Sequence, residues 1–277
     1  MRAIAKVPSM PRFAANLSMM FNEVPFLERF AEAAHAGFRG VEFLSPYDYQ
    51  PGEIAERARE HKLEVVLFNA AMGDRAAGDR GLASLPGREH EFAAELSNAL
   101  RYAKALGTPR LHVMAGLLPD GADAGERARR LRTYVRNLGH ACDEARAFGV
   151  TVLIEPINPR DIPNYLLNTQ AEAHRIREEI GAPNLKVQMD FYHCQIVEGD
   201  LADTFRHWQP HIGHVQIAGV PGRHEPDIGE INYPYLFRLL DDARYEGWIG
   251  CEYRPRGTTA EGLNWFYRLI DREPVRS

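Results

Sequence analysis

The chain has 277 residues, 45% of them hydrophobic and 26% charged, with a formal net charge of -5 and a pI near 6.1. Nucleic-acid proteins carry a basic face that neutralises phosphate, so this acidic balance indicates no nucleic-acid partner. No apolar run approaches the ~18 residues of a membrane span, and the first residues lack the apolar run of a signal peptide. Three separated cysteines indicate reduced thiols rather than a disulfide framework. We therefore expect a cytoplasmic protein without a membrane segment.

Short apolar segments alternate with longer amphipathic ones along the chain. The apolar segments predict buried parallel strands at residues 12–17, 40–44, 63–69, 110–114, 150–155, 185–190, 212–217 and 248–252. Helical periodicity follows, for example at residues 26–35, 89–106, 124–148, 169–180 and 233–242. A glycine stands shortly before several strands, where it predicts the end of the preceding helix: Gly37, Gly107, Gly149, Gly181 and Gly247.

Eight strand and helix pairs without a Pro/Ser-rich linker predict an α/β fold, a closed (β/α)8 TIM barrel in a single domain. A doubly wound open sheet is the alternative, but that fold usually has a glycine-rich phosphate loop after its first strand. Here the sequence AANLSMMF occupies that position. We expect the barrel domain to span residues 10–277 and residues 1–9 to be an N-terminal extension, with Met10 as a candidate natural start.

Four predicted strands in the second half of the chain end in oxygen-bearing side chains: Glu155, Asp190, Gln216 and Glu252. The carboxyl ends of barrel strands meet on one face, so these side chains are expected to lie together. Three carboxylates in one place repel one another unless a cation joins them. An all-oxygen ligand set favours Mg²⁺ or Mn²⁺ over zinc. A single strand-end acid is as readily explained as a loop cap, but four on consecutive strands are not.

Other polar residues near these ends leave more than one interpretation open. With the ion counted, the site has a charge of about -1, so an anionic substrate needs a separate cation, and Arg223 in the VPGRHEP loop is a candidate. Asp161 could cap a helix or bind substrate hydroxyls. His193, close to an apolar strand, could be a hydrogen-bonded structural residue.

The chain resembles the hydroxypyruvate isomerase family of the sugar-isomerase and endonuclease IV-like barrels. The matching segments are FAANLSMMF (13–21), GFRGVEFLSPYDY (37–49), LPGREHEF (85–92), VLIEPIN (152–158), YHCQIVEGD (192–200), VQIAGVPGRHEPDIGEINY (215–233) and GWIGCEYRPRG (247–257). The segments FAANLSMMF, HVMAG and VQIAG are most similar to the 2-oxo-tetronate isomerase branch.

This resemblance implies roles for individual residues. It implies that Glu155, Asp190, Gln216 and Glu252 bind the divalent metal, and that Glu155 and Glu252 also form the acid/base pair. His193 and Arg223 match family positions that hold the oxygens and carboxylate of the substrate.

The expected activity is an aldose-ketose type isomerisation of a small hydroxylated 2-oxo acid through a metal-stabilised cis-enediolate. Hydroxypyruvate would give tartronate semialdehyde, or 2-oxo-tetronate its isomer. Three alternatives remain open from sequence: a ketose 3-epimerase with a similar metal site, a tri-zinc abasic-site endonuclease, and a non-catalytic barrel that binds a small molecule. The oligomeric state is also open, a homo-oligomer included.

Overall fold

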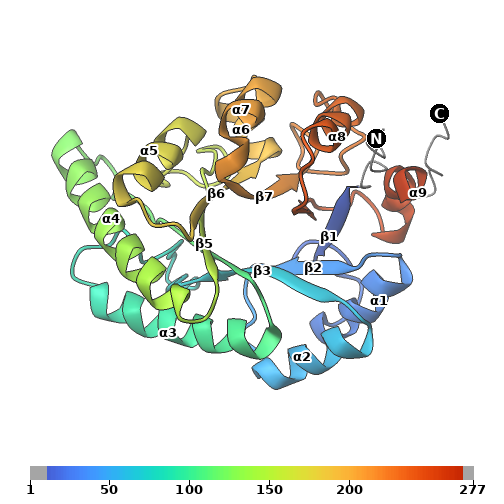
Figure 1. Cartoon of the computed structure of the whole chain (residues 1–277), viewed down its shortest axis with the longest axis horizontal. Helices are drawn as coiled ribbons and strands as arrows, with labels where there is room; N and C mark the ends of the chain where they lie inside the picture. The colour runs from blue at the N-terminus through green and yellow to red at the C-terminus, as the bar shows by residue number, and fades with distance from the viewer. Residues whose placement is uncertain (1–10, 271–277) are drawn as a thin grey trace, which may run out of the picture.

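The computed structural model describes residues 11–270, whose strands form one closed barrel (Figure 1). Each strand pairs in parallel with the next in the chain, and β8 pairs with β1. The strands are β1 (Arg12–Asn16), β2 (Gly40–Phe43), β3 (Glu64–Ala70), β4 (Arg110–Val113), β5 (Thr151–Ile154), β6 (Leu185–Asp190), β7 (Ile212–Ile217) and β8 (Trp248–Cys251). The predicted barrel is confirmed, and the open doubly wound sheet is wrong because the β1–β8 pairing leaves no free edge.

Helices follow the strands and cover the outside of the barrel (Figure 1). They are α1 (Arg29–His35), α2 (Pro51–Glu60), α3 (Glu89–Leu106), α4 (Ala124–Arg146), α5 (Gln170–Ile180), α6 (Phe191–Val197), α7 (Leu201–Trp208), α8 (Tyr233–Asp242) and α9 (Asn264–Ile270), with 3₁₀ turns at Phe26–Glu28, Gln209–His211 and Ala260–Leu263. The predicted helices at 89–106 and 233–242 have these bounds. Residues 26–28 form a 3₁₀ turn before α1, and α4 ends two residues before the predicted 148.

One predicted helix end is wrong. Gly107 and Gly181 adopt the left-handed conformation and close α3 and α5 as expected. Gly247 does not close α8, because the turn after this helix uses Arg244 with φ of 54°. Gly247 instead lies against Tyr245, since a Cβ atom there would come within 2.3 Å of the Tyr245 hydroxyl oxygen.

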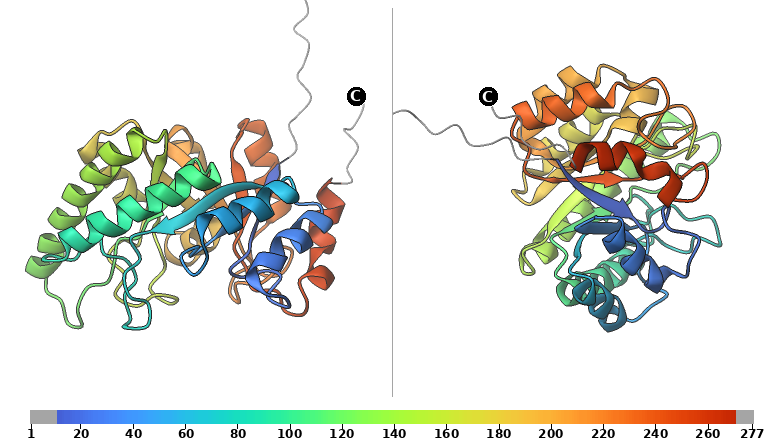
Figure 2. Two further views of the ribbon diagram at one scale, coloured as in Figure 1. Left: turned by 90° about the horizontal axis from the view of Figure 1, so that it is seen from below. Right: turned by 90° about the vertical axis from the view of Figure 1, so that its right-hand side faces the viewer.

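The two ends of the described chain meet beside the first strand. Figure 2 shows α9 close to β1, and Phe13 of β1 makes edge-to-face contacts with Trp265 and Phe266, at centroid distances of 5.4 and 5.8 Å. These apolar contacts cover the seam where β8 closes on β1.

The parallel arrangement brings all eight carboxyl ends of the strands to one face. Asp190 is the last residue of β6, Gln216 lies near the end of β7, and Glu155 and Glu252 directly follow β5 and β8. The predicted N-terminal extension, residues 1–9, lies outside the described residues. The three cysteines are buried and free. None of the helices between residues 11 and 270 combines the length and the apolar character that crossing a bilayer requires.

Candidate active site

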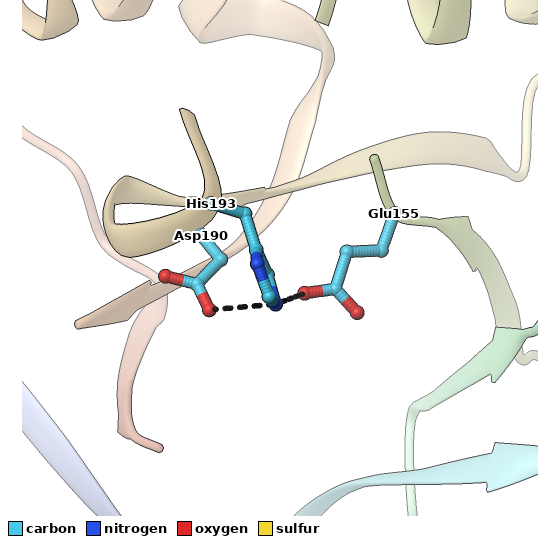
Figure 3. Close-up of side chains that lie close together, drawn as sticks. All are labelled: Glu155, Asp190 and His193. Atoms are coloured by element: carbon cyan, nitrogen blue, oxygen red, sulfur yellow. Dashed lines mark ion pairs between the residues drawn. The ribbon is translucent and has the colours of Figure 1, made fainter. Parts of the chain in front are cut away.

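Two buried carboxylates and one imidazole face one another at the carboxyl ends of β5 and β6 (Figure 3). The His193 Nε2 atom lies 3.9 Å from Glu155 Oε1 and 3.7 Å from Asp190 Oδ2. In the described part of the chain, these three residues form the only group of at least three His, Cys, Asp or Glu side chains close enough to share an ion.

Hydrogen bonds hold His193 with its N–H group toward the carboxylates. The Asp161 backbone N–H donates to Asn158 Oδ1 over 2.8 Å, so the Asn158 Nδ2 group is turned toward His193 Nδ1, 2.6 Å away. A donor faces each ring nitrogen, since Arg223 Nη2 also lies 3.3 Å from Nε2. The shorter contact is the one at Nδ1, and it assigns the acceptor role to that atom, which leaves the hydrogen on Nε2 in the neutral ring. Burial lowers the pKa of His193 well below its usual value, with Arg223 adding to the effect. His193 is therefore arranged as a donor toward oxygen rather than as a metal ligand.

Arg223 connects the remaining acidic groups. Its Nη2 atom lies 2.9 Å from Glu252 Oε1 and 3.7 Å from Asp190 Oδ2, while Nη1 lies 3.1 Å from Asp161 Oδ2. Asp161 also accepts a hydrogen bond from the Tyr192 hydroxyl over 3.0 Å. The helix-cap interpretation of Asp161 is wrong, since Asp161 lies in a turn and Thr169 caps the next helix, α5.

The carboxyl groups are difficult to ionise together. Burial raises the pKa of Glu252 to about 8 and of Asp190 to about 6. Burial, followed by repulsion from Glu252 and Asp190, raises the pKa of Glu155 well above its usual value. One guanidinium does not balance this cluster, so the site attracts further positive charge.

The donor set fits a divalent cation. Glu155 Oε1 and Asp190 Oδ2 are buried without a hydrogen-bond partner among the described residues. The second oxygen of Asp190 is held by the backbone N–H of Tyr192 over 2.8 Å, which fixes the direction of the carboxylate. Unsatisfied, buried carboxylate oxygens that converge are the groups a hard metal ion binds.

Gln216 lies beside this group and is bonded at both ends of its amide. Its Nε2 atom donates to Glu42 Oε1 over 2.7 Å, and its Oε1 atom accepts from Gln188 Nε2 over 2.7 Å. Glu42 is buried inside the barrel and also contacts His214 Nε2 at 2.7 Å and Asn16 Nδ2 at 3.1 Å. The structure therefore brings Glu155 and Asp190 together with His193, and it links Glu252 to Asp190 through Arg223 Nη2. The oxygen of Gln216 faces another amide.

Sequence reasoning missed the polar layer beneath the strand ends. His112 of β4 lies with Nδ1 3.4 Å from Glu155 Oε2 and 3.2 Å from Asn69 Oδ1. Burial lowers the pKa of His112 to about 3, so the ring is neutral. The sequence did show a polar residue among apolar ones in these strands, namely Glu42 in GVEF and His112 in RLHV. Such a pattern does not reveal which residue of a distant strand is the partner.

A cavity of about 360 Å³ opens above these groups. Glu155 and Glu252 line one part of it, together with His193 and Arg223. Met19 also lines the cavity. A volume of this size accommodates a small molecule at the acidic cluster.

A family model described as a xylose isomerase-like TIM barrel matches residues 30–269. The chain belongs to this family, and within it to the group that contains the hydroxypyruvate and 2-oxo-tetronate isomerases. The family resemblance predicted from the sequence is confirmed, and with it the expectation that the protein is an enzyme of the isomerase class.

Particular relatives match over nearly their whole length. A 2-oxo-tetronate isomerase from Cupriavidus necator is 58% identical, over 95% of this chain and 100% of the relative. The hydroxypyruvate isomerase of Escherichia coli is 46% identical, over 92% of this chain and 98% of the relative. A crystal structure described as an AP endonuclease of family 2 from Brucella melitensis has a TM-score of 0.91 and 50% identity, covering 95% of this chain and 100% of that one.

Proposed function

We propose that the protein isomerises a small hydroxylated 2-oxo acid, with hydroxypyruvate and 2-oxo-tetronate as the substrates to test. The observation that carries the proposal is the pair of buried carboxylates Glu155 and Asp190 beside His193, with Arg223 joining Asp190 to the buried Glu252 at the mouth of the barrel. The names of the close relatives support the same chemistry.

Glu155, Asp190 and Glu252 would hold Mg²⁺ or Mn²⁺, with Gln216 as the fourth ligand. Such an ion would supply a Lewis acid that stabilises negative charge on two adjacent substrate oxygens by several kcal/mol. Asp190 would only bind the metal and would take no part in proton transfer. The hydrogen bond from Tyr192 N–H to Oδ1 fixes its carboxylate, and Oδ2 is left free to bind the ion.

Glu155 and Glu252 perform the proton transfers in the proposed reaction. Glu252 removes the proton bound to one carbon, which forms the enediolate, and a proton is then returned to the adjacent carbon. Glu155 moves the hydroxyl proton from one of the two substrate oxygens to the other. Arg223 holds Glu252 in position over 2.9 Å, and His193 donates its Nε2 hydrogen to a substrate oxygen. General acid/base catalysis of this kind contributes roughly 10²–10⁴-fold to the rate.

The test measures turnover of hydroxypyruvate and 2-oxo-tetronate, with and without a chelator, in the unmodified protein and in Glu155→Gln and Glu252→Gln. Each substitution should reduce kcat at least roughly 10²-fold and abolish exchange of solvent deuterium into the substrate, while the fold persists. Glu225→Gln is the matched control, because Glu225 is also a buried carboxylate after β7 but bonds the Arg256 backbone N–H at 3.0 Å. Full activity in either glutamate variant, or in the chelated protein, would refute the mechanism.

A further inference from the structure

The charge around the candidate site leaves the carboxylate of an acidic substrate without a partner. Arg223 is the cation nearest the acidic cluster, but it lies within 4 Å of Asp161 as well as Asp190 and Glu252. Counting Glu155, four carboxylates outnumber the combined charge of Arg223 and one divalent ion by one. A substrate anion therefore requires another cation.

Three further arginines line the same cavity, and they differ in their surroundings. They are Arg75, Arg80 and Arg254. Within residues 11–270, none of the three has a carboxylate partner within 4.0 Å. Arg75 and Arg254 are exposed, whereas Arg80 is partly buried. A partly buried cation is less screened by water and interacts more strongly with an anion.

Arg80 is also held in place by hydrogen bonds of the backbone around it, unlike Arg75 of the same loop. The residues that follow it bond back to the start of the same loop, with Gly81 N–H donating to Met72 O and Leu82 N–H to Ala71 O, each over 3.0 Å. The Arg80 Nη1 atom donates to Asp79 O over 2.6 Å. Arg75, in contrast, lies in the exposed stretch 74–78 of this loop. Arg80 thus loses less conformational freedom when it binds an anion.

The position of Arg80 suits the far end of a substrate. The proposed catalytic and metal-binding residues come from β5 to β8 or directly follow them, whereas Arg80 follows β3 on the opposite half of the barrel. A substrate whose carbonyl and hydroxyl face β5 to β8 directs its remaining end across the cavity, toward the β3 side.

We propose that Arg80 binds the carboxylate of the substrate and thereby makes this site select 2-oxo acids over uncharged ketoses. This inference rests on the proposed function, because it uses the same cavity. It assigns to Arg223 the positioning of Glu252 and contact with other substrate oxygens, and it assigns the carboxylate to a residue of the β3–α3 loop.

The test compares two ligands that differ at one group: hydroxypyruvate, and dihydroxyacetone, in which –CH₂OH replaces the carboxylate. Binding is measured by calorimetry on Mg²⁺-loaded protein that keeps Glu252, with each ligand first brought to equilibrium with its isomer so that no net turnover adds heat. Adding Arg80→Gln should weaken hydroxypyruvate binding roughly 10- to 100-fold, the range for a charge-assisted pair. Dihydroxyacetone binding and Mg²⁺ affinity should stay within about twofold. Arg80→Lys should restore part of the acid binding, and Arg75→Gln is the matched control, expected to bind like the parent.

Several results would overturn the assignment. Equal weakening of both ligands or of Mg²⁺ would mean that Arg80 only maintains the loop, and unchanged acid binding would remove its role. A parent protein with no preference for the acid, or a selectivity lost in Arg254→Gln instead, would also refute the proposal. Turnover of hydroxypyruvate by the unmodified protein is scored separately. Acid-selective binding through Arg80 without turnover would therefore refute the isomerase function and leave this inference intact.

Discussion

Glu42 is the residue whose substitution tests the polar interior of the barrel most directly. Its buried carboxylate receives three contacts from other strands: His214 Nε2 at 2.7 Å, Gln216 Nε2 at 2.7 Å and Asn16 Nδ2 at 3.1 Å. Glu42→Gln keeps the size of the side chain but replaces one acceptor oxygen with an NH₂ group. In the Oε1 position that group faces the amide donors of Asn16 and Gln216. In the Oε2 position it faces His214 Nε2, which can accept only if the ring proton moves to Nδ1, a buried atom without a partner among the described residues.

The expected cost is the loss of one or more charge-assisted hydrogen bonds and the desolvation of a buried donor. Together these amount to about 3 kcal/mol of unfolding free energy. No relaxation relieves the conflict easily, because the Glu42 carboxylate is packed against Gly250, where a Cβ atom would come within 2.4 Å of Oε2. Gln216 would also lose the acceptor that orients its amide, so Mg²⁺ affinity should fall roughly 10- to 100-fold, as for other supporting residues of metal sites.

Urea denaturation with chelator present gives the stability, and calorimetric titration gives the Mg²⁺ affinity. Glu64→Gln is the control, because Glu64 is exposed and pairs with Arg12 at 3.3 Å, and the amide oxygen of Gln can still accept the bond from Trp248 Nε1. This change should cost no more than about 1 kcal/mol. A Glu42→Gln protein within about 0.5 kcal/mol of the parent would refute the reasoning. Lost stability with unchanged Mg²⁺ affinity would show that Glu42 supports the barrel but not the orientation of Gln216.

Two further predictions concern the charge and the ligand type of the proposed metal site. Burial raises the pKa of Glu252 to about 8 and of Asp190 to about 6. Between pH 5 and pH 8 the folded, metal-free protein therefore binds more protons than the unfolded chain. Its unfolding free energy should fall as the pH rises from about 5 to about 8. Added Mg²⁺ should restore more stability at pH 8 than at pH 5 in thermal unfolding, and equal stability of the chelated protein at both pH values would contradict this. Gln216→His should move the activity profile from Mg²⁺ toward Co²⁺ and Zn²⁺ because nitrogen is a softer ligand, and an unchanged metal profile would argue against Gln216 as a ligand.

The sequence alone determined the barrel and the chain order of its acidic groups. Parallel strands buried on both faces read as short apolar runs, and the residue that ends each run must emerge at the common rim. For this reason Asp190 could be placed at the end of its strand, and Glu155 and Glu252 to within one residue of theirs, before any partner was known. Helices such as those at 89–106 and 233–242 were also readable, since apolar periodicity and a closing glycine such as Gly107 act within a few residues of the chain.

Only the tertiary structure decided which side chains meet. Glu42 and His214 are 172 positions apart in the chain, and their 2.7 Å contact depends on the closure and register of the barrel. The pairing of Asp161 with Arg223 has the same origin, because two irregular loops bring the groups to 3.1 Å. The hydrophobic periodicity of a sequence indicates whether each residue is buried, one residue at a time. It carries no information on the partner that a buried charge finds across the interior, and this partner sets the charge, the protonation and the direction of each group in the site.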